Sequence, residues 1–275
     1  MNNVYKILLV VIGLKIIVGI TYIKGIIESI GTNLESLKNN LDFDSLFRLT
    51  DLCLTLIISI VITIGLVLQV LQKNKSLNLW LRVSIIYYTA FYILASLPSL
   101  ILMDSLSFVA RMTSLEKLRF FVNTLAIISL IIVYTIYINQ FFKDKNHKIT
   151  DDVSDKRDIR FLNYILDFLM IAYISFRASK YPFFQNWDYP TVFILLSFFY
   201  YFSLETLFKQ TMGKVITGTH VYSQKYNYIG AVFLRTLCRR IPFEPLSFFG
   251  FGRWHDTLSK TEIVKINIEQ KLEYK

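Results

Sequence analysis

The stretch Arg160-Phe-Leu-Asn-Tyr-Ile-Leu-Asp167 opens an apolar segment that runs to about Ser175. The segment is typical of a membrane-spanning helix, yet it contains a carboxylate and begins with a guanidinium. Seven residues make about two helical turns, so the two charges share one face, roughly 10 Å apart along the axis. A charge in hydrocarbon costs on the order of several kcal/mol unless it is paired, hydrated or buried against protein. Asp167 therefore requires partners from elsewhere in the fold.

The composition of the whole chain is typical of a polytopic membrane protein. Hydrophobic residues make up 54% of the 275 residues and charged residues only 18%, and the mean hydropathy is +0.46. Soluble domains carry about a quarter charged residues and lack repeated apolar runs near 20 residues. The net charge is +10, but the basic residues lie between apolar runs, as the positive-inside rule requires. We therefore expect a lipid bilayer as partner and no nucleic acid.

Six apolar segments predict an all-α bundle of six membrane-spanning helices. They lie at about 5–27, 52–71, 83–103, 120–142, 160–177 and 191–208. If both termini are cytoplasmic, the inside segments hold more than twice as many Lys and Arg residues as the outside segments, which favours this orientation. We expect a multi-pass protein of the cell membrane, of the bacterial inner-membrane type.

A charged segment, 143–156, divides the chain and is expected to be a cytoplasmic linker. It separates a four-span region, 1–142, whose role the sequence does not indicate, from a C-terminal membrane domain, 157–267. Residues 268–275 are expected to form a polar tail.

The pattern changes after the sixth span, where the sequence predicts a small cytoplasmic cap. Segments 217–223 and 261–267 have strand-like patterns and are predicted to pair as a β-ribbon. The segment 231–241 between them predicts an amphipathic helix. This helix carries a triple-arginine cluster, expected to contact anionic lipid headgroups at about 1 kcal/mol per cation; its members are Arg235, Arg239 and Arg240.

Four sequence motifs follow one another in the C-terminal half. They are Arg160-Phe-Leu-Asn-Tyr-Ile-Leu-Asp167, Glu205 with Gln210-Thr-Met-Gly-Lys-Val-Ile-Thr-Gly218, Leu234-Arg-Thr-Leu-Cys-Arg-Arg-Ile-Pro242, and Trp254-His-Asp-Thr-Leu-Ser-Lys-Thr261. In this order they resemble the RDD family of bacterial membrane proteins, named for an arginine and two aspartates. The resemblance covers about 157–267. It implies that Arg160 is the family's arginine and that Asp167 and Asp256 are its aspartates.

The sequence departs from the family's pattern at one turn. The family usually has Gly-x-Thr before its Gly-Lys, whereas this chain has Lys209-Gln-Thr211, so we expect the turn to differ. Some family members are similar to proteins described as Na⁺/H⁺ or K⁺/H⁺ antiporters, and most have no assigned activity.

Two functions remain open at the level of sequence. In the first, the protein exchanges H⁺ for Na⁺ or K⁺, with Asp167 as the exchange site and Arg160 modulating its pKa. In the second, it is a non-catalytic scaffold or accessory protein that binds another membrane protein or a second copy of itself. Arg160, Asp167, Glu205 and Asp256 are then a structural charge network at the cytoplasmic face. No nucleophile–base set, nucleotide-binding loop or metal-ligand spacing is visible, so no catalytic residue, metal or cofactor is expected.

Two local pairings are also open. Asn163 lies one helical turn before Asp167 and is placed to hydrogen-bond its carboxylate. Glu205 is placed to pair with Lys209 one turn later, or across helices with Arg160 or Arg235.

Overall fold

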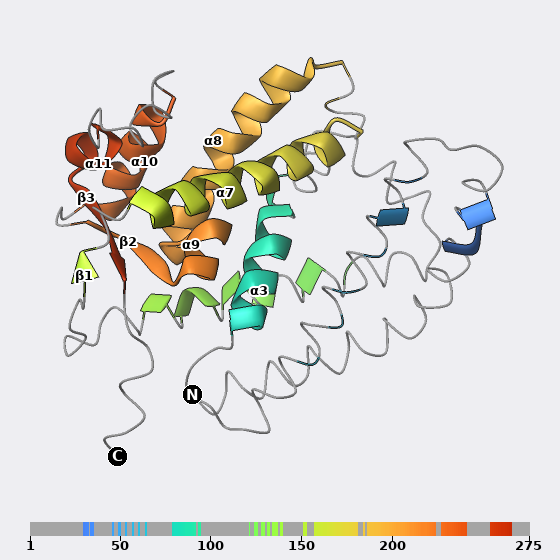
Figure 1. Ribbon diagram of the computed structural model, residues 1–275, viewed down its shortest axis with the longest axis horizontal. Helices are drawn as coiled ribbons and strands as arrows, with labels where there is room; N and C mark the ends of the chain where they lie inside the picture. Colours follow the sequence, from blue (N-terminus) through green and yellow to red (C-terminus); the bar gives the residue numbers. More distant parts are fainter. Residues whose placement is uncertain are drawn as a thin grey trace. The chain divides into compact units, whose positions relative to one another are not determined.

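The computed structural model of this chain is mostly helical, with a small antiparallel sheet (Figure 1). It describes residues 79–91, 93–94, 151–152, 157–180, 184, 186–223, 227–240 and 254–265, together with single residues and short groups between 30 and 139. The chain divides into two compact units. One comprises Met1–Ile85 and Val109–Val133, and the other comprises Ile86–Phe108 and Tyr134–Lys275. The site described below lies wholly in the second unit.

Two long apolar helices dominate the second unit, α7 (Arg157–Ala178) and α8 (Tyr189–Phe208). By length and composition both are candidate membrane spans, and they coincide with the predicted fifth and sixth spans. The first two predicted spans fall largely outside the described residues. Helix α3 (Leu79–Phe91) overlaps the third, and the described residues of the fourth, between 121 and 139, are helical. The six-span count therefore stays a prediction.

Local sequence chemistry sets both ends of α8. Asp188 caps its N-terminus, because its carboxylate accepts the backbone N–H of Thr191 at 3.0 Å, and Pro190 occupies the first turn. At the other end Lys209 takes a left-handed backbone conformation, φ 56°, and its N–H donates to the carbonyl of Glu205 at 3.0 Å. The chain therefore turns sharply at Lys209.

Three short helices and three strands complete the described C-terminal part. They are α9 (Met212–Thr217), α10 (Tyr228–Cys238), α11 (Trp254–Ser259), β1 (Asp151–Asp152), β2 (Thr219–Ser223) and β3 (Thr261–Lys265). The predicted amphipathic helix is confirmed as α10, and the predicted β-ribbon as the antiparallel pair β2–β3, in which Val221 lies opposite Ile263. The strand β1 also pairs with β3, giving the order β1-β3-β2. This strand falls within the segment expected to be a linker.

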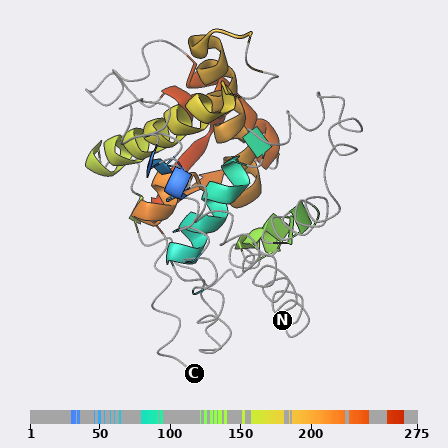
Figure 2. The ribbon, with the colours of Figure 1, turned by 90° about the vertical axis from the view of Figure 1, so that its right-hand side faces the viewer.

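The short elements gather at one end of the helix pair, beside the start of α7 and the end of α8 (Figure 1). Helix α9 contacts α7, α10 contacts α8 and α11, and α11 contacts β3. In Figure 2 the orange and red ribbons of these elements lie behind α7. Buried residues recur at every fourth position along the inward face of α8, as helical periodicity requires. This row comprises Val192, Leu196, Tyr200, Leu204 and Phe208.

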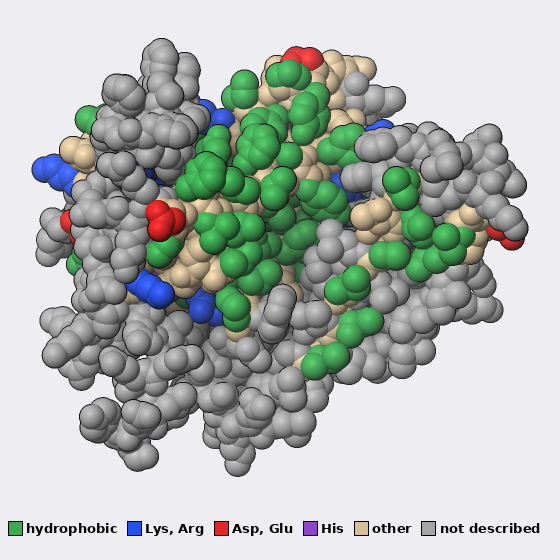
Figure 3. All heavy atoms as spheres, in the orientation of Figure 1, with side chains coloured by type: hydrophobic (Ala, Val, Ile, Leu, Met, Phe, Trp, Pro, Cys, Tyr) green, Lys and Arg blue, Asp and Glu red, His purple; other side chains and the backbone are tan. Residues whose placement is uncertain are grey.

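The outward faces of α7 and α8 are apolar. Figure 3 shows hydrophobic side chains covering the middle of the visible face, over these two helices. Exposed members include Phe161, Leu162, Phe168, Leu169 and Ile194. Exposed apolar surface of this extent is typical of contact with lipid or with another protein. The polar side chains described below lie on the opposite, inward faces.

The turn at Lys209 gives a test of the fold. A side chain at positive φ costs about 1–2 kcal/mol relative to glycine, and the Lys209 ammonium lies 5.1 Å from the centre of the Tyr228 ring. Lys209→Ala removes this cation–π contact and keeps the strain, whereas Lys209→Gly removes both. We expect the free energy of unfolding in detergent to be about 1 kcal/mol higher for Lys209→Gly than for Lys209→Ala. Equal stability of the two variants would contradict the strained turn.

Candidate functional site

Asp167 lies on the inward face of α7 and is 1% exposed. Its carboxylate accepts hydrogen bonds from the Tyr200 hydroxyl at 2.9 Å, the Thr211 hydroxyl at 2.7 Å and the Gly213 N–H at 2.9 Å. These donors come from α8, from the residue before α9 and from α9 itself. Asp167 therefore joins three elements through one carboxylate.

Gly213 is needed for this arrangement because α9 lies directly against α7. A Cβ atom at Gly213 would stand 2.5 Å from the backbone oxygen of Asn163 and 2.8 Å from its Cα atom. Only a residue without a side chain brings its N–H close enough to Asp167.

Asn163 does not bind Asp167, so the expected pairing along α7 is wrong. Its amide oxygen accepts the Thr217 hydroxyl at 2.7 Å, and its Nδ2 donates to the Thr219 hydroxyl at 3.3 Å. Asn163 thus fixes the junction of α9 and β2, while Asp167 takes its donors from α8 and from the start of α9.

Glu205 is the second enclosed carboxylate, with 0% exposure near the end of α8. Three cations surround it: Lys214 Nζ at 2.9 Å, Arg239 Nη1 at 3.0 Å and Arg235 Nε at 3.4 Å. Of the two pairings left open, the structure shows the one across helices, with Arg235. Lys209 turns instead to the ring of Tyr228.

Asp256 lies on α11 and is 5% exposed. Its carboxylate accepts a hydrogen bond from Arg235 Nη1 and lies 3.4 Å from Arg160 Nη2. Arg235 also donates to the Thr261 hydroxyl at 2.6 Å. The structure therefore brings Arg160, Glu205 and Asp256 together through Arg235, whereas Asp167 has a separate set of donors.

Lys214 connects these two groups, and the sequence did not single it out as a site residue. Its ammonium donates to Glu205 and, at 3.3 Å, to the hydroxyl of Thr211, which in turn donates to Asp167. Burial lowers the pKa of Lys214 from its usual value, and Glu205 opposes that shift. The Gly-Lys motif marks Lys214 in the sequence, but the role of this lysine follows only from the position of α9 in the fold.

The triple-arginine cluster is turned further inward than expected. Arg235 is fully buried and Arg239 is 9% exposed at its side chain, so both face carboxylates rather than the surface expected for headgroup contact. Arg239 also lies 4.2 Å from the centre of the Tyr201 ring. Arg240 is half-buried, and its contact with headgroups stays a prediction.

His255 is buried beside this network, and its Nε2 atom lies 3.4 Å from Oδ1 of Asp256. Burial lowers the pKa of His255 well below 6.5, and the neighbouring Arg235, Arg239 and Arg160 lower it further. The imidazole is therefore neutral near pH 7, and its contact with Asp256 is not an ion pair there.

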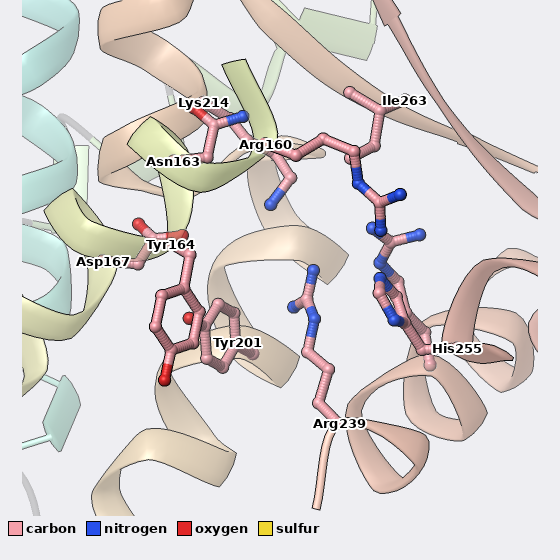
Figure 4. A pocket seen from close by; sticks show the side chains of 10 residues that line it. Arg160, Asn163, Tyr164, Asp167, Tyr201, Lys214, Arg239, His255 and Ile263 are labelled. Carbon is pink, nitrogen blue, oxygen red and sulfur yellow. The ribbon is translucent and has the colours of Figure 1, made fainter. Parts of the chain in front are cut away.

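A small, partly open cavity of about 30 Å³ lies between α7, α9, α10 and α11, room for about one or two water molecules. Four cationic side chains line it, together with Asp167, His255 and two tyrosines. Figure 4 shows Lys214 and Arg239 reaching toward the same space from opposite sides. Within the described ranges, no group of three or more His, Cys, Asp and Glu side chains is placed to hold a metal ion.

Residues 158–253 match the model described as RDD family. This part of the chain is an RDD family domain. Arg160 and Asp167 lie within the matched residues, and Asp256 lies just beyond them. No curated protein and no solved structure matches the chain.

Glu205 gives the test of the charge network in the RDD domain. Glu205→Gln keeps the shape of the side chain but leaves Lys214, Arg235 and Arg239 without their shared carboxylate. Breaking a buried ion pair costs about 3–5 kcal/mol, so we expect a loss of this order in the free energy of unfolding. The control is Glu262→Gln on β3, a half-exposed acid, for which a change of about 0.5 kcal/mol or less is expected. Similar losses in both variants would show that Glu205 has no special role.

Proposed function

We propose that this chain is a six-span membrane protein with both termini in the cytoplasm, and that its RDD domain is a non-catalytic module for binding other membrane proteins. The two candidate spans and the apolar outward faces of α7 and α8 support membrane association. The observation that favours a structural role of the site over ion exchange is the enclosure of Asp167 by three donors.

An ionised carboxylate has about four lone-pair positions for hydrogen bonds. Three donors already bind Asp167, and the side chain is 1% exposed. A transported cation would therefore find at most one free lone-pair position on this carboxylate unless it displaced these donors. Since the donors tie α7 to α8 and α9, this displacement would also loosen the packing of the domain. These contacts support a structural acceptor.

The charges around the cavity also argue against cation exchange at Asp167. Arg160, Lys214, Arg235 and Arg239 line the space that borders Asp167. Two unit charges 4 Å apart interact by about 4 kcal/mol at an effective dielectric constant of 20. A cluster of fixed cations therefore disfavours the entry of Na⁺ or K⁺.

Exchange of H⁺ for Na⁺ or K⁺ is the second candidate function. One observation favours it: Asp167 borders a partly open cavity, and acids within membrane spans often mark ion pathways. The two candidates differ in whether Asp167 changes its partners during function.

Reconstitution in lipid vesicles with an internal pH-sensitive dye separates the candidates. Under the module proposal, adding Na⁺, K⁺ or Li⁺ produces proton flux no greater than in empty vesicles, for the wild type and for Asp167→Asn alike. The control variant is Asp158→Asn, an exposed acid on the same helix. Flux above that of empty vesicles that survives in Asp158→Asn and disappears in Asp167→Asn would overturn the proposal and support exchange.

A further inference from the structure

We propose that the cavity between α7, α9, α10 and α11 is a binding site for one oxyanion of the phosphate type. The anion is supplied either by the headgroup of an anionic lipid or by free phosphate. This inference does not depend on the proposed module function, because an anion site is compatible with either candidate.

The charges at the cavity do not balance. Four cationic side chains line it, Arg160, Lys214, Arg235 and Arg239. Three carboxylates lie among them, Asp167 in the lining and Glu205 and Asp256 in ion pairs with the lining cations. With all seven groups ionised, these side chains alone carry one positive charge more than negative. Guanidinium and ammonium groups brought together in this way are the donors that bind oxyanions in proteins.

Arg235 supplies an unused donor. It is 0% exposed, and its Nη2 atom has no hydrogen-bond partner among the described residues. Its Nη1 atom is already bound to Asp256 and Thr261. Buried guanidinium N–H groups normally find acceptors. Because Arg235 lines the cavity, an oxyanion there is placed to accept this remaining donor.

The surroundings of His255, which also lines the cavity, show that this environment is positive. Beyond the effect of its burial, three arginines, Arg235, Arg239 and Arg160, lower its pKa, and Glu205 opposes them with a smaller effect. An environment that disfavours an imidazolium favours an anion. A monovalent cation is disfavoured for the same reason.

The size and position of the cavity limit the ligand. A volume of about 30 Å³ admits one or two oxygen-sized groups, and the space is partly open. It therefore suits the unesterified oxygens of a phosphate whose remainder stays outside. Helix α10, which carries Arg235 and Arg239 on its inward side, exposes Phe233 and Leu237. A lipid whose phosphate enters the cavity has apolar surface nearby for its acyl chains.

The melting temperature of the full-length protein tests the site in two arms. In the first arm, delipidated protein in a neutral detergent is titrated with inorganic phosphate, and sodium gluconate holds the ionic strength constant. In the second arm, the protein is compared in nanodiscs of phosphatidylglycerol and of phosphatidylcholine. We expect the melting temperature to rise by at least about 2 °C with phosphate or with phosphatidylglycerol. A rise in the first arm indicates that free phosphate binds; a rise confined to the second indicates a lipid headgroup.

Arg239→Gln is the matched variant. It removes one of the four cations that line the cavity, so we expect the anion-dependent rise to disappear. Arg177→Gln, at the far end of α7, makes the same chemical change away from the cavity and should keep the rise. Equilibrium dialysis of the wild type with radiolabelled phosphate adds a measurement that needs no variant. If free phosphate binds, about one bound phosphate per chain is expected. The proposal is overturned if neither arm shows a rise, or if Arg239→Gln keeps the full rise.

Discussion

A carboxylate removed from water must be surrounded by donors or cations, and the RDD domain meets this requirement at two places. Asp167 is enclosed by hydrogen-bond donors and Glu205 by cations. Lys214 connects the two, because it binds Glu205 directly and Asp167 through the hydroxyl of Thr211. One chain of polar contacts therefore runs from α7 through α9 to α8. The placement of α10 and α11 depends on the same chain, since Arg235 joins Glu205 to Asp256.

This constraint explains why a domain with such apolar helices carries so many buried charges. The outward faces of α7 and α8 provide apolar surface, so they cannot specify how the short C-terminal elements pack. Ion pairs and hydrogen bonds are directional, and in surroundings of low dielectric constant they are strong when satisfied and costly when broken. The polar centre therefore specifies one arrangement of α9, α10 and α11 at the end of the helix pair.

Local patterns in the sequence predicted the two spans α7 and α8, the amphipathic helix α10 and the pairing of β2 with β3. Each depends on periodicity within one segment or on two short segments of matching pattern. The partners of Asp167 were not predicted, because Tyr200, Thr211 and Gly213 lie 33 to 46 positions away along the chain. Strand β1 was missed because two residues carry no periodicity. The left-handed conformation at Lys209 was not predicted, because the residue there is not glycine.

The proposed structural role of Asp167 depends most on its contact with Thr211, which ties α7 to the turn before α9. A double-mutant cycle between Asp167→Ala and Thr211→Val measures this contact directly, through the free energy of unfolding of the full-length protein in detergent. We expect the two substitutions to be non-additive by about 1 kcal/mol or more, because either one already removes their shared hydrogen bond. Additivity within about 0.3–0.5 kcal/mol would show that the two side chains are independent and would contradict the account.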